Sequence, residues 1–271
     1  MNYHPIDIRI LAFGLSLRSL PSTVADVSLA YLSSPPGNQF LDPPRLIDQQ
    51  LGYDVFSHEL GLLSQRLVRL RLDDATLNLT DFFNCSPHTV WPRLEWLDFS
   101  CLQAACADGT WYFTMDPRMN SYDYEEDPQA HTLEDMREYM EEDELPAAMD
   151  VPLNPFRTAM DPAKFNAIYV AVAQAVKRMP KLRKLEISFG LQGDAGMGPG
   201  DHEFSYMHGT TESWCQESSA DIKVGWGMIP AVEIDDEVLA AWREVGEAKG
   251  ASIELYLRDQ GEDYYDYRVI E

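Results

Sequence analysis

The histidines and cysteines of this sequence are the side chains best suited to nucleophilic or metal chemistry, but their spacing argues against both. Of the six histidines, His202 and His208 share one alternating stretch. In a strand they would lie ~20 Å apart, too far to bind one metal ion. The His202-Glu203 pair also lacks the second histidine of a His-Glu-x-x-His zinc site. Of the four cysteines, only Cys101 and Cys106 are close together, and no second pair completes a zinc site. We therefore expect reduced, mostly buried thiols and no metal or cofactor.

A glycine-rich run at residues 190–200 is the other candidate for chemistry, as a phosphate-binding loop. It lacks the Gly-Lys-Ser/Thr ending, carries Asp194 where phosphate would be repelled, and does not lead into a helix. The nucleophile elbow of serine hydrolases, Gly-x-Ser-x-Gly, is also absent, because the stretch 14–18 lacks the second glycine. These patterns predict a protein that is not an enzyme. A small-molecule-binding or enzymatic domain that uses a pocket near the 190–200 loop stays the alternative.

The charge of the chain is strongly negative and uneven. Its 45 acidic and 21 basic residues give a formal net charge of −24, which argues against nucleic acid as a partner. Twelve acidic residues lie between Asp123 and Asp150, against Arg137 alone. Such a stretch repels itself and has few apolar residues to bury, so residues 114–154 are predicted to be an acidic, flexible insertion.

Two acidic strips also contain tyrosines, around Tyr124 and Tyr265. Tyrosine provides contact area at low entropic cost while carboxylates steer a partner, so both strips are candidate binding sites for a basic peptide. The alternative is that they are solvated edges. The N-terminus shows no basic region followed by an apolar run, and no apolar stretch reaches the ~20 residues that span a bilayer. These features predict an intracellular protein, cytoplasmic or nuclear, without a membrane partner.

The elements that would position these side chains follow a repeated pattern. Three segments run from a turn into a strand with alternating leucines, at 66–72, 91–99 and 179–187. This is the turn-then-strand half of a leucine-rich repeat, in which alternate leucines enter the core. Anchored on Leu29, Leu70 and Leu97, the repeats are spaced by 41 and 27 residues, and the acidic insertion separates Leu97 from Leu185. Leu70, Leu97 and Leu185 are predicted to occupy equivalent inward positions.

The remaining helices and strands can be placed by periodicity and by capping residues. Asp161-Pro162 is typical of a helix start, and Gly250 of a helix end. In the helix at 54–65, Val55, Leu60, Leu62 and Leu63 are predicted to form the buried side. The predicted helices are 8–20, 54–65, 162–178 and 234–245, a further helical segment opens at 77–83, and the predicted strands are 25–32, 67–72, 94–99, 182–189, 202–208, 221–228 and 252–257.

These elements predict one α/β domain over residues 1–271. Its fold is a degenerate leucine-rich-repeat-like curved sheet, backed by helices, with the acidic insertion and an antiparallel C-terminal end. The open face of such a sheet is the usual binding surface of a solenoid. Six polar residues between the strand leucines are predicted to line it: Arg69, Arg71, Glu95, Arg183, Lys184 and Glu186. Four are basic and two acidic, so this face would suit an acidic protein partner.

The order of several motifs resembles the C-terminal leucine-rich-repeat-like region of fungal F-box family proteins. The motifs are 91–97 (Trp-Pro-Arg-Leu-Glu-Trp-Leu), 108–113 (Asp-Gly-Thr-Trp-Tyr-Phe), the acidic stretch 123–150, 155–157 (Pro-Phe-Arg) and 178–185, which contains Met-Pro-Lys-Leu. The similarity covers residues 60–190 and rests on order and spacing. The resemblance implies a non-catalytic scaffold that captures substrates for a ubiquitin ligase. The family's N-terminal F-box is not recognisable in residues 1–20, so these residues do not predict binding of the ligase adaptor.

Overall fold

The chain alternates helices with strands. The computed structural model describes residues 8–30, 43, 45–48, 51–85, 88–114, 159–190, 202–209, 220–228, 234–258 and 267–270. Its helices are α1 (Ile8–Ser16), continued by the short 3-10 helix η1 (Leu17–Ser19), then α2 (Val55–Ser64), α3 (Leu79–Phe83), α5 (Pro162–Val176) and α6 (Asp236–Lys249). Its strands are β1 (Asp26–Ala30), β2 (Arg69–Asp73), β3 (Trp96–Gln103), β4 (Phe113–Thr114), β5 (Ala159–Met160), β6 (Lys184–Gly190), β7 (His202–His208), β8 (Ile222–Met228), β9 (Ile253–Arg258) and β10 (Tyr267–Val269).

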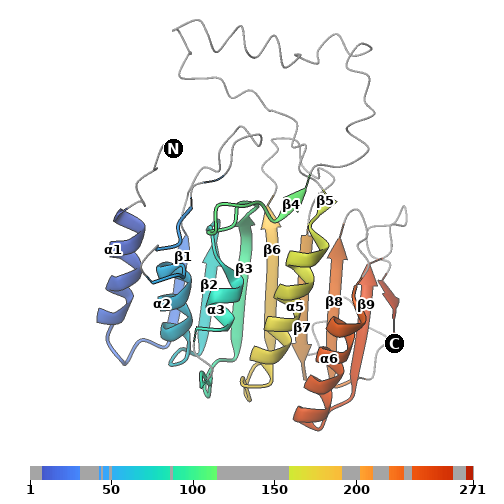
Figure 1. Cartoon of the computed structure of the whole chain (residues 1–271). Helices are drawn as coiled ribbons and strands as arrows, with labels where there is room; N and C mark the ends of the chain where they lie inside the picture. The colour runs from blue at the N-terminus through green and yellow to red at the C-terminus, as the bar shows by residue number, and fades with distance from the viewer. Residues whose placement is uncertain are drawn as a thin grey trace, which may run out of the picture.

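One large sheet organises these elements (Figure 1). Within the described residues it has eight strands, in the order β1-β2-β3-β6-β7-β8-β9-β10. β1, β2, β3 and β6 run parallel, and so do β8 and β9, whereas β7 and β10 run antiparallel to their neighbours. The prediction of a mostly parallel α/β sheet is therefore confirmed. The predicted antiparallel C-terminal end holds only in part, because β7 pairs with β8 in antiparallel but β8 pairs with β9 in parallel.

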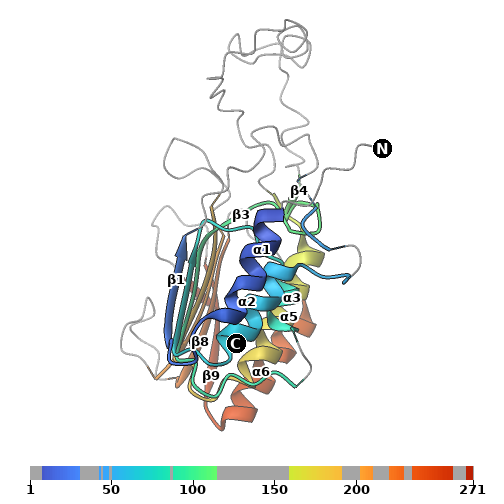
Figure 2. The same cartoon turned by 90° about the vertical axis from the view of Figure 1, so that its left-hand side faces the viewer.

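All helices lie on one face of this sheet, and within the described residues no helix covers the other face (Figure 2). This arrangement gives the molecule a helix layer and an open sheet face. None of the helices that the structure describes is both long and apolar enough to cross a membrane.

Local sequence explains where the helices begin and end. Asp54 caps α2 by accepting hydrogen bonds from the backbone N–H groups of Phe56 and Ser57, and Asp161 caps α5 in the same way, followed by proline. α6 ends at Gly250, whose φ of 62° is the left-handed conformation that glycine adopts without strain. Gly61 lets α2 approach α3, because a Cβ at this position would lie 2.6 Å from the backbone oxygen of Phe82.

The predicted register holds at the centre of the sheet. Leu70 pairs with Leu97 and Leu97 with Leu185, and all three are fully buried under the helices. The predicted anchor in the first strand was wrong, because Val27, not Leu29, pairs with Leu70. Leu29 pairs with Leu72, so the anchor was placed one inward position too far along β1, while both residues still face the helix layer.

One further difference from the sequence prediction concerns α2. Leu62 was expected in the core but is 36% exposed, and Glu59 is buried on the helix instead. The predicted insertion lies outside the described residues, except for Thr114 at its start. Its flanks are joined by an antiparallel ladder in which Phe113 pairs with Met160. The chain therefore leaves and re-enters the fold at one place.

Candidate protein-binding surface

The open sheet face presents two rows of side chains that alternate with the core residues. The first row follows the strand register across the sheet and contains Asp26, Arg69, Trp96, Lys184, Met207, Lys223 and Glu254. The second row contains Ser28, Arg71, Asp98, Glu186, Ser205, Gly225 and Tyr256. We call the surface that carries these rows the open face.

The accessible part of the open face lies over β1, β2, β3 and β6. Arg69 and Arg71 are exposed, and Trp96 is 38% exposed. Over β7, β8 and β9, in contrast, Ser205 and Tyr256 are buried. A partner that approaches this face would therefore meet the N-terminal half of the sheet first.

Trp96 is the largest apolar side chain on the accessible part. The ammonium of Lys184 lies 4.8 Å from the centroid of its ring, a cation–π geometry. The same ammonium is 2.7 Å from a carboxylate oxygen of Glu186. The indole is therefore held beside a charged pair while one side of it stays accessible. Tryptophan and arginine are enriched among the residues that dominate binding energy at interfaces.

In the second row, ion pairs with neighbouring carboxylates fix the orientation of the Arg71 side chain. Arg71 makes two hydrogen bonds to the carboxylate of Asp73, through Nε at 2.9 Å and Nη2 at 3.1 Å. Its Nε also lies 3.9 Å from Asp98, and the hydrogen bonds to Asp73 raise the pKa of Arg71. Because a bidentate guanidinium has a fixed orientation, Arg71 is presented to a partner in one geometry.

The predicted binding residues are only partly brought together. Arg69, Arg71, Lys184 and Glu186 lie on the open face, as expected. Glu95 and Arg183 lie one residue before β3 and β6, where their backbone groups start the ladder between the strands. Tyr124 and Tyr265 lie outside the described residues, as does the 191–200 part of the glycine-rich loop.

Among the residues of the open face that were not predicted are Trp96 and Asp98 of β3. The signal was present, because Leu97 and Phe99 enter the core and their neighbours must then face the other way. In the N-terminal strands the same rule places every second residue on the open face.

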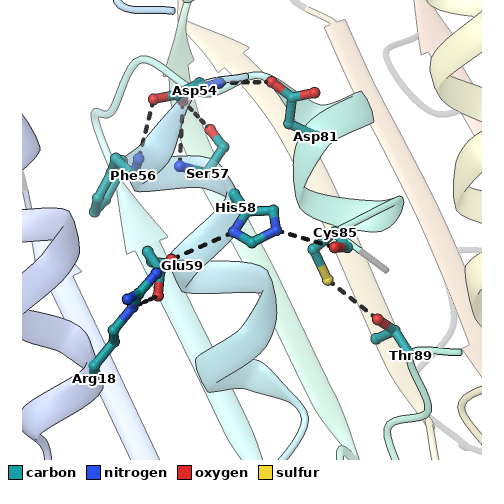
Figure 3. A network of polar contacts seen from close by, with 9 residues as sticks. All are labelled: Arg18, Asp54, Phe56, Ser57, His58, Glu59, Asp81, Cys85 and Thr89. Atoms are coloured by element: carbon teal, nitrogen blue, oxygen red, sulfur yellow. Dashed lines mark hydrogen bonds and ion pairs between the residues drawn. The ribbon is translucent and has the colours of Figure 1, made fainter. Parts of the chain in front are cut away.

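A second cluster of polar residues joins η1, α2 and α3 in the helix layer (Figure 3). Arg18 donates two hydrogen bonds to the carboxylate of Glu59, whose side chain is only 1% exposed, and this pairing lowers the pKa of Glu59. Nε2 of His58 lies 3.0 Å from the backbone oxygen of Cys85, while the thiol of Cys85 contacts the hydroxyl of Thr89. The imidazole is thus bonded to a carbonyl and not to the thiol, so these residues do not form a nucleophile–base pair.

His202 lies in the core, between α5 and the sheet. Its Nε2 shares a hydrogen bond with the hydroxyl of Tyr169, and its ring packs against Phe165 and Phe189 with centroid distances of 4.6 Å and 5.3 Å. Burial lowers the pKa of His202 to about 3, so the imidazole is neutral at ordinary pH. In the part of the chain that the structure describes, no group of three or more His, Cys, Asp or Glu side chains is placed to hold a metal ion.

The fold and the open face together define an α/β protein whose sheet is covered by helices on one side. Residues 153–265, which include α5, β6, β7, β8, α6 and β9, match the model of a family of unknown function (DUF6546). No curated protein and no solved structure matches the chain.

Proposed function

We propose that this protein is a non-catalytic scaffold, a degenerate leucine-rich-repeat-like domain that binds a protein partner on its open face. The observation that carries the proposal is the one-sided cover of the sheet, which leaves Arg69, Arg71 and Trp96 exposed on regular strands. A rigid sheet positions such residues without the entropic cost of ordering a loop.

The order of the strands supports the same proposal. Strands that are consecutive along the chain lie next to one another in the large sheet, and each of β2, β3, β6 and β9 follows a helix of the helix layer. This stepwise growth is typical of repeat proteins, which use the surface formed by equivalent strand positions to bind other proteins. The polar network of Arg18 and Glu59 stabilises the helix layer and contributes no exposed nucleophile.

A more specific form of this proposal is that the protein is related to fungal F-box proteins. In that form the open face would bind a substrate of a ubiquitin ligase, inside the cell, in the cytoplasm or nucleus. The order of motifs from Trp91 to Leu185 supports it. The corresponding test is whether the ligase adaptor is recovered together with the full chain.

The proposal is tested by capture of partners on two matched variants. Trp96→Ala removes the exposed aromatic side chain of the open face, and Phe13→Ala removes one of similar exposure, 41% against 38%, from α1 in the helix layer. Proteins retained from a fungal lysate by the parent and by each variant are quantified by mass spectrometry. Both variants are first checked for an unchanged circular dichroism spectrum.

The expected result is that a specific set of proteins is retained by the parent and by Phe13→Ala but lost from Trp96→Ala. Removal of an interface tryptophan typically weakens binding by ~2 kcal/mol or more, which is about 30-fold in affinity. The proposal is overturned if the two variants retain the same proteins in the same amounts as the parent.

A further inference from the structure

A basic edge borders the open face of this otherwise acidic protein. The turns that enter β2, β3 and β6 carry six basic residues, of which Lys177 pairs with Glu244 and Arg178 donates to the backbone oxygen of Phe83. The other four form the basic edge: Arg66, Arg93, Lys181 and Arg183. Glu95 is the only acidic residue within these turns, at 65–68, 92–95 and 177–183. Since the chain has 45 acidic and 21 basic residues, this concentration of positive charge is opposite to its average.

The backbone places these charges at equivalent positions. The N–H of Glu95 donates to the oxygen of Val68 at 2.8 Å, and the N–H of Arg183 donates to the oxygen of Glu95 at 2.9 Å. Val68, Glu95 and Arg183 therefore occupy one position in three successive units. Two residues earlier in each unit stand Arg66, Arg93 and Lys181, so the backbones of these three follow one another at the ~4.8 Å spacing of neighbouring strands.

The positive charges of the basic edge are mostly exposed and not neutralised by acidic side chains of the described residues. Arg93, Lys181 and Arg183 are exposed, and none of them forms an ion pair with any residue in the described ranges. Nη2 of Arg66 donates a hydrogen bond to the backbone oxygen of Leu20 at 2.7 Å, which holds the guanidinium in place without neutralising it. Closely spaced cations of this kind add their fields, since their separation is below the Debye length of ~8 Å at physiological salt.

Trp96 connects the basic edge to the open face. It is the first residue of β3 and directly follows Glu95, so its exposed ring lies beside the row of cations. Arg69 and Lys184 flank it in the first row of the open face. An apolar contact surface with cations around it fits a segment that has an apolar side chain between carboxylates.

We propose that the basic edge and Trp96 bind an acidic peptide segment of the partner protein, one that carries several Asp or Glu residues around an apolar residue. This inference rests on the proposed function, because it names the chemistry of the partner that the open face would bind. The carboxylates would contact Arg93, Lys181 and Arg183, while the apolar residue would contact the ring of Trp96.

The test uses the full chain and a fluorescent 12-residue peptide of glutamates around a central leucine, followed by fluorescence anisotropy. The first comparison peptide replaces each glutamate by glutamine. The double variant Arg93→Glu/Lys181→Glu reverses two charges of the basic edge. The matched control, Arg45→Glu/Arg243→Glu, makes the same change of charge at two other exposed positions.

The expected result is that the glutamate peptide binds and the glutamine peptide does not. The affinity should fall roughly tenfold or more in Arg93→Glu/Lys181→Glu, since each reversed charge replaces an attraction by a repulsion. It should change by less than about twofold in the control, and binding to the parent should weaken as salt rises.

Three results overturn the inference. The first is equal binding of the glutamine peptide, and the second is equal loss of affinity in the control variant. The third is that a single-stranded RNA of the same charge binds more tightly than the glutamate peptide, which would mean that the basic edge binds nucleic acid and not an acidic peptide. If any of these three results is found but Trp96→Ala still loses its captured proteins, the open face binds a partner, and that partner is not an acidic peptide segment. If Trp96→Ala loses nothing, the proposed function itself fails.

Discussion

Acidification should destabilise this protein through His202, which is neutral and buried in the folded state. Its ring is enclosed by Phe165, Tyr169 and Phe189, and burial lowers its pKa from 6.5 to about 3. In the unfolded chain the same imidazole is solvated and takes up a proton below pH ~6.5. Between these two pKa values the unfolded state binds more protons than the folded state. The stability contributed by the neutral imidazole is therefore present above pH ~6.5 and lost as the pH falls towards ~3.

The size of this effect follows from the two pKa values. Between about pH 7.5 and about pH 5, protonation of His202 in the unfolded chain lowers the free energy of unfolding by ~2 kcal/mol. Most carboxylates stay ionised in this range, so the histidine contribution can be separated from acid denaturation. The perturbation is His202→Gln, because a glutamine amide keeps a hydrogen-bonding group for the hydroxyl of Tyr169 and does not titrate.

The assay is urea unfolding of the parent and of His202→Gln at several pH values, followed by tryptophan fluorescence. The parent should lose ~2 kcal/mol more than the variant between about pH 7.5 and about pH 5. His88→Gln, which changes an exposed histidine, should lose as much as the parent. If the stabilities of the parent and of His202→Gln depend on pH in the same way, the imidazole of His202 is not buried and neutral in the folded protein.

Three further predictions concern the core, the helix layer and the insertion. Leu97→Ala should lower the free energy of unfolding by ~2 to 5 kcal/mol in urea denaturation, whereas Leu62→Ala, on an exposed part of α2, should cost much less; equal losses would contradict the register of the sheet. Arg18→Met should destabilise the protein because the buried carboxylate of Glu59 loses its guanidinium partner and keeps only the contact with Nδ1 of His58 at 3.4 Å, and adding Glu59→Leu should restore stability in a double-mutant cycle; additive losses would show that the pair is not coupled. Deletion of residues 123–150 should leave the melting temperature nearly unchanged, because the ladder between β4 and β5 joins the flanks, and a large decrease in a thermal scan would show that the segment packs on the fold.

The parts of this fold that could be predicted from sequence are those set by local patterns. Asp161-Pro162 and Gly250 mark helix ends through backbone chemistry that needs no distant partner. Alternation placed Leu70, Leu97 and Leu185 in the core because a strand with one covered face must bury every second residue.

The parts that could not be predicted depend on contacts between distant residues. The partner of Leu70 is Val27 and not Leu29, and both candidates have the same periodicity and similar side chains. The buried carboxylate of Glu59 on α2 is paired with Arg18, which lies 41 residues earlier in the chain. The interruption of β3 at Cys101, where φ is 53° and the ladder to β6 shifts, has no marker such as glycine in the sequence.

The candidate binding surface was also predicted only in part, because some of its residues follow from local patterns and others from contacts between distant residues. Arg69, Arg71, Lys184 and Glu186 follow from alternation alone. The basic edge instead requires the hydrogen bonds that align three turns far apart in the chain, and those become apparent only when the strands are paired.

Hydroxyl-radical footprinting of the complex with a captured partner would show whether the open face is the surface that binds it. Trp96 on the open face and Phe13 in the helix layer are aromatic side chains of similar exposure, so each reports on one face. If the partner binds the open face, it should lower the oxidation rate of Trp96 and leave that of Phe13 unchanged. Protection of Phe13 with no change at Trp96 would contradict binding at the open face.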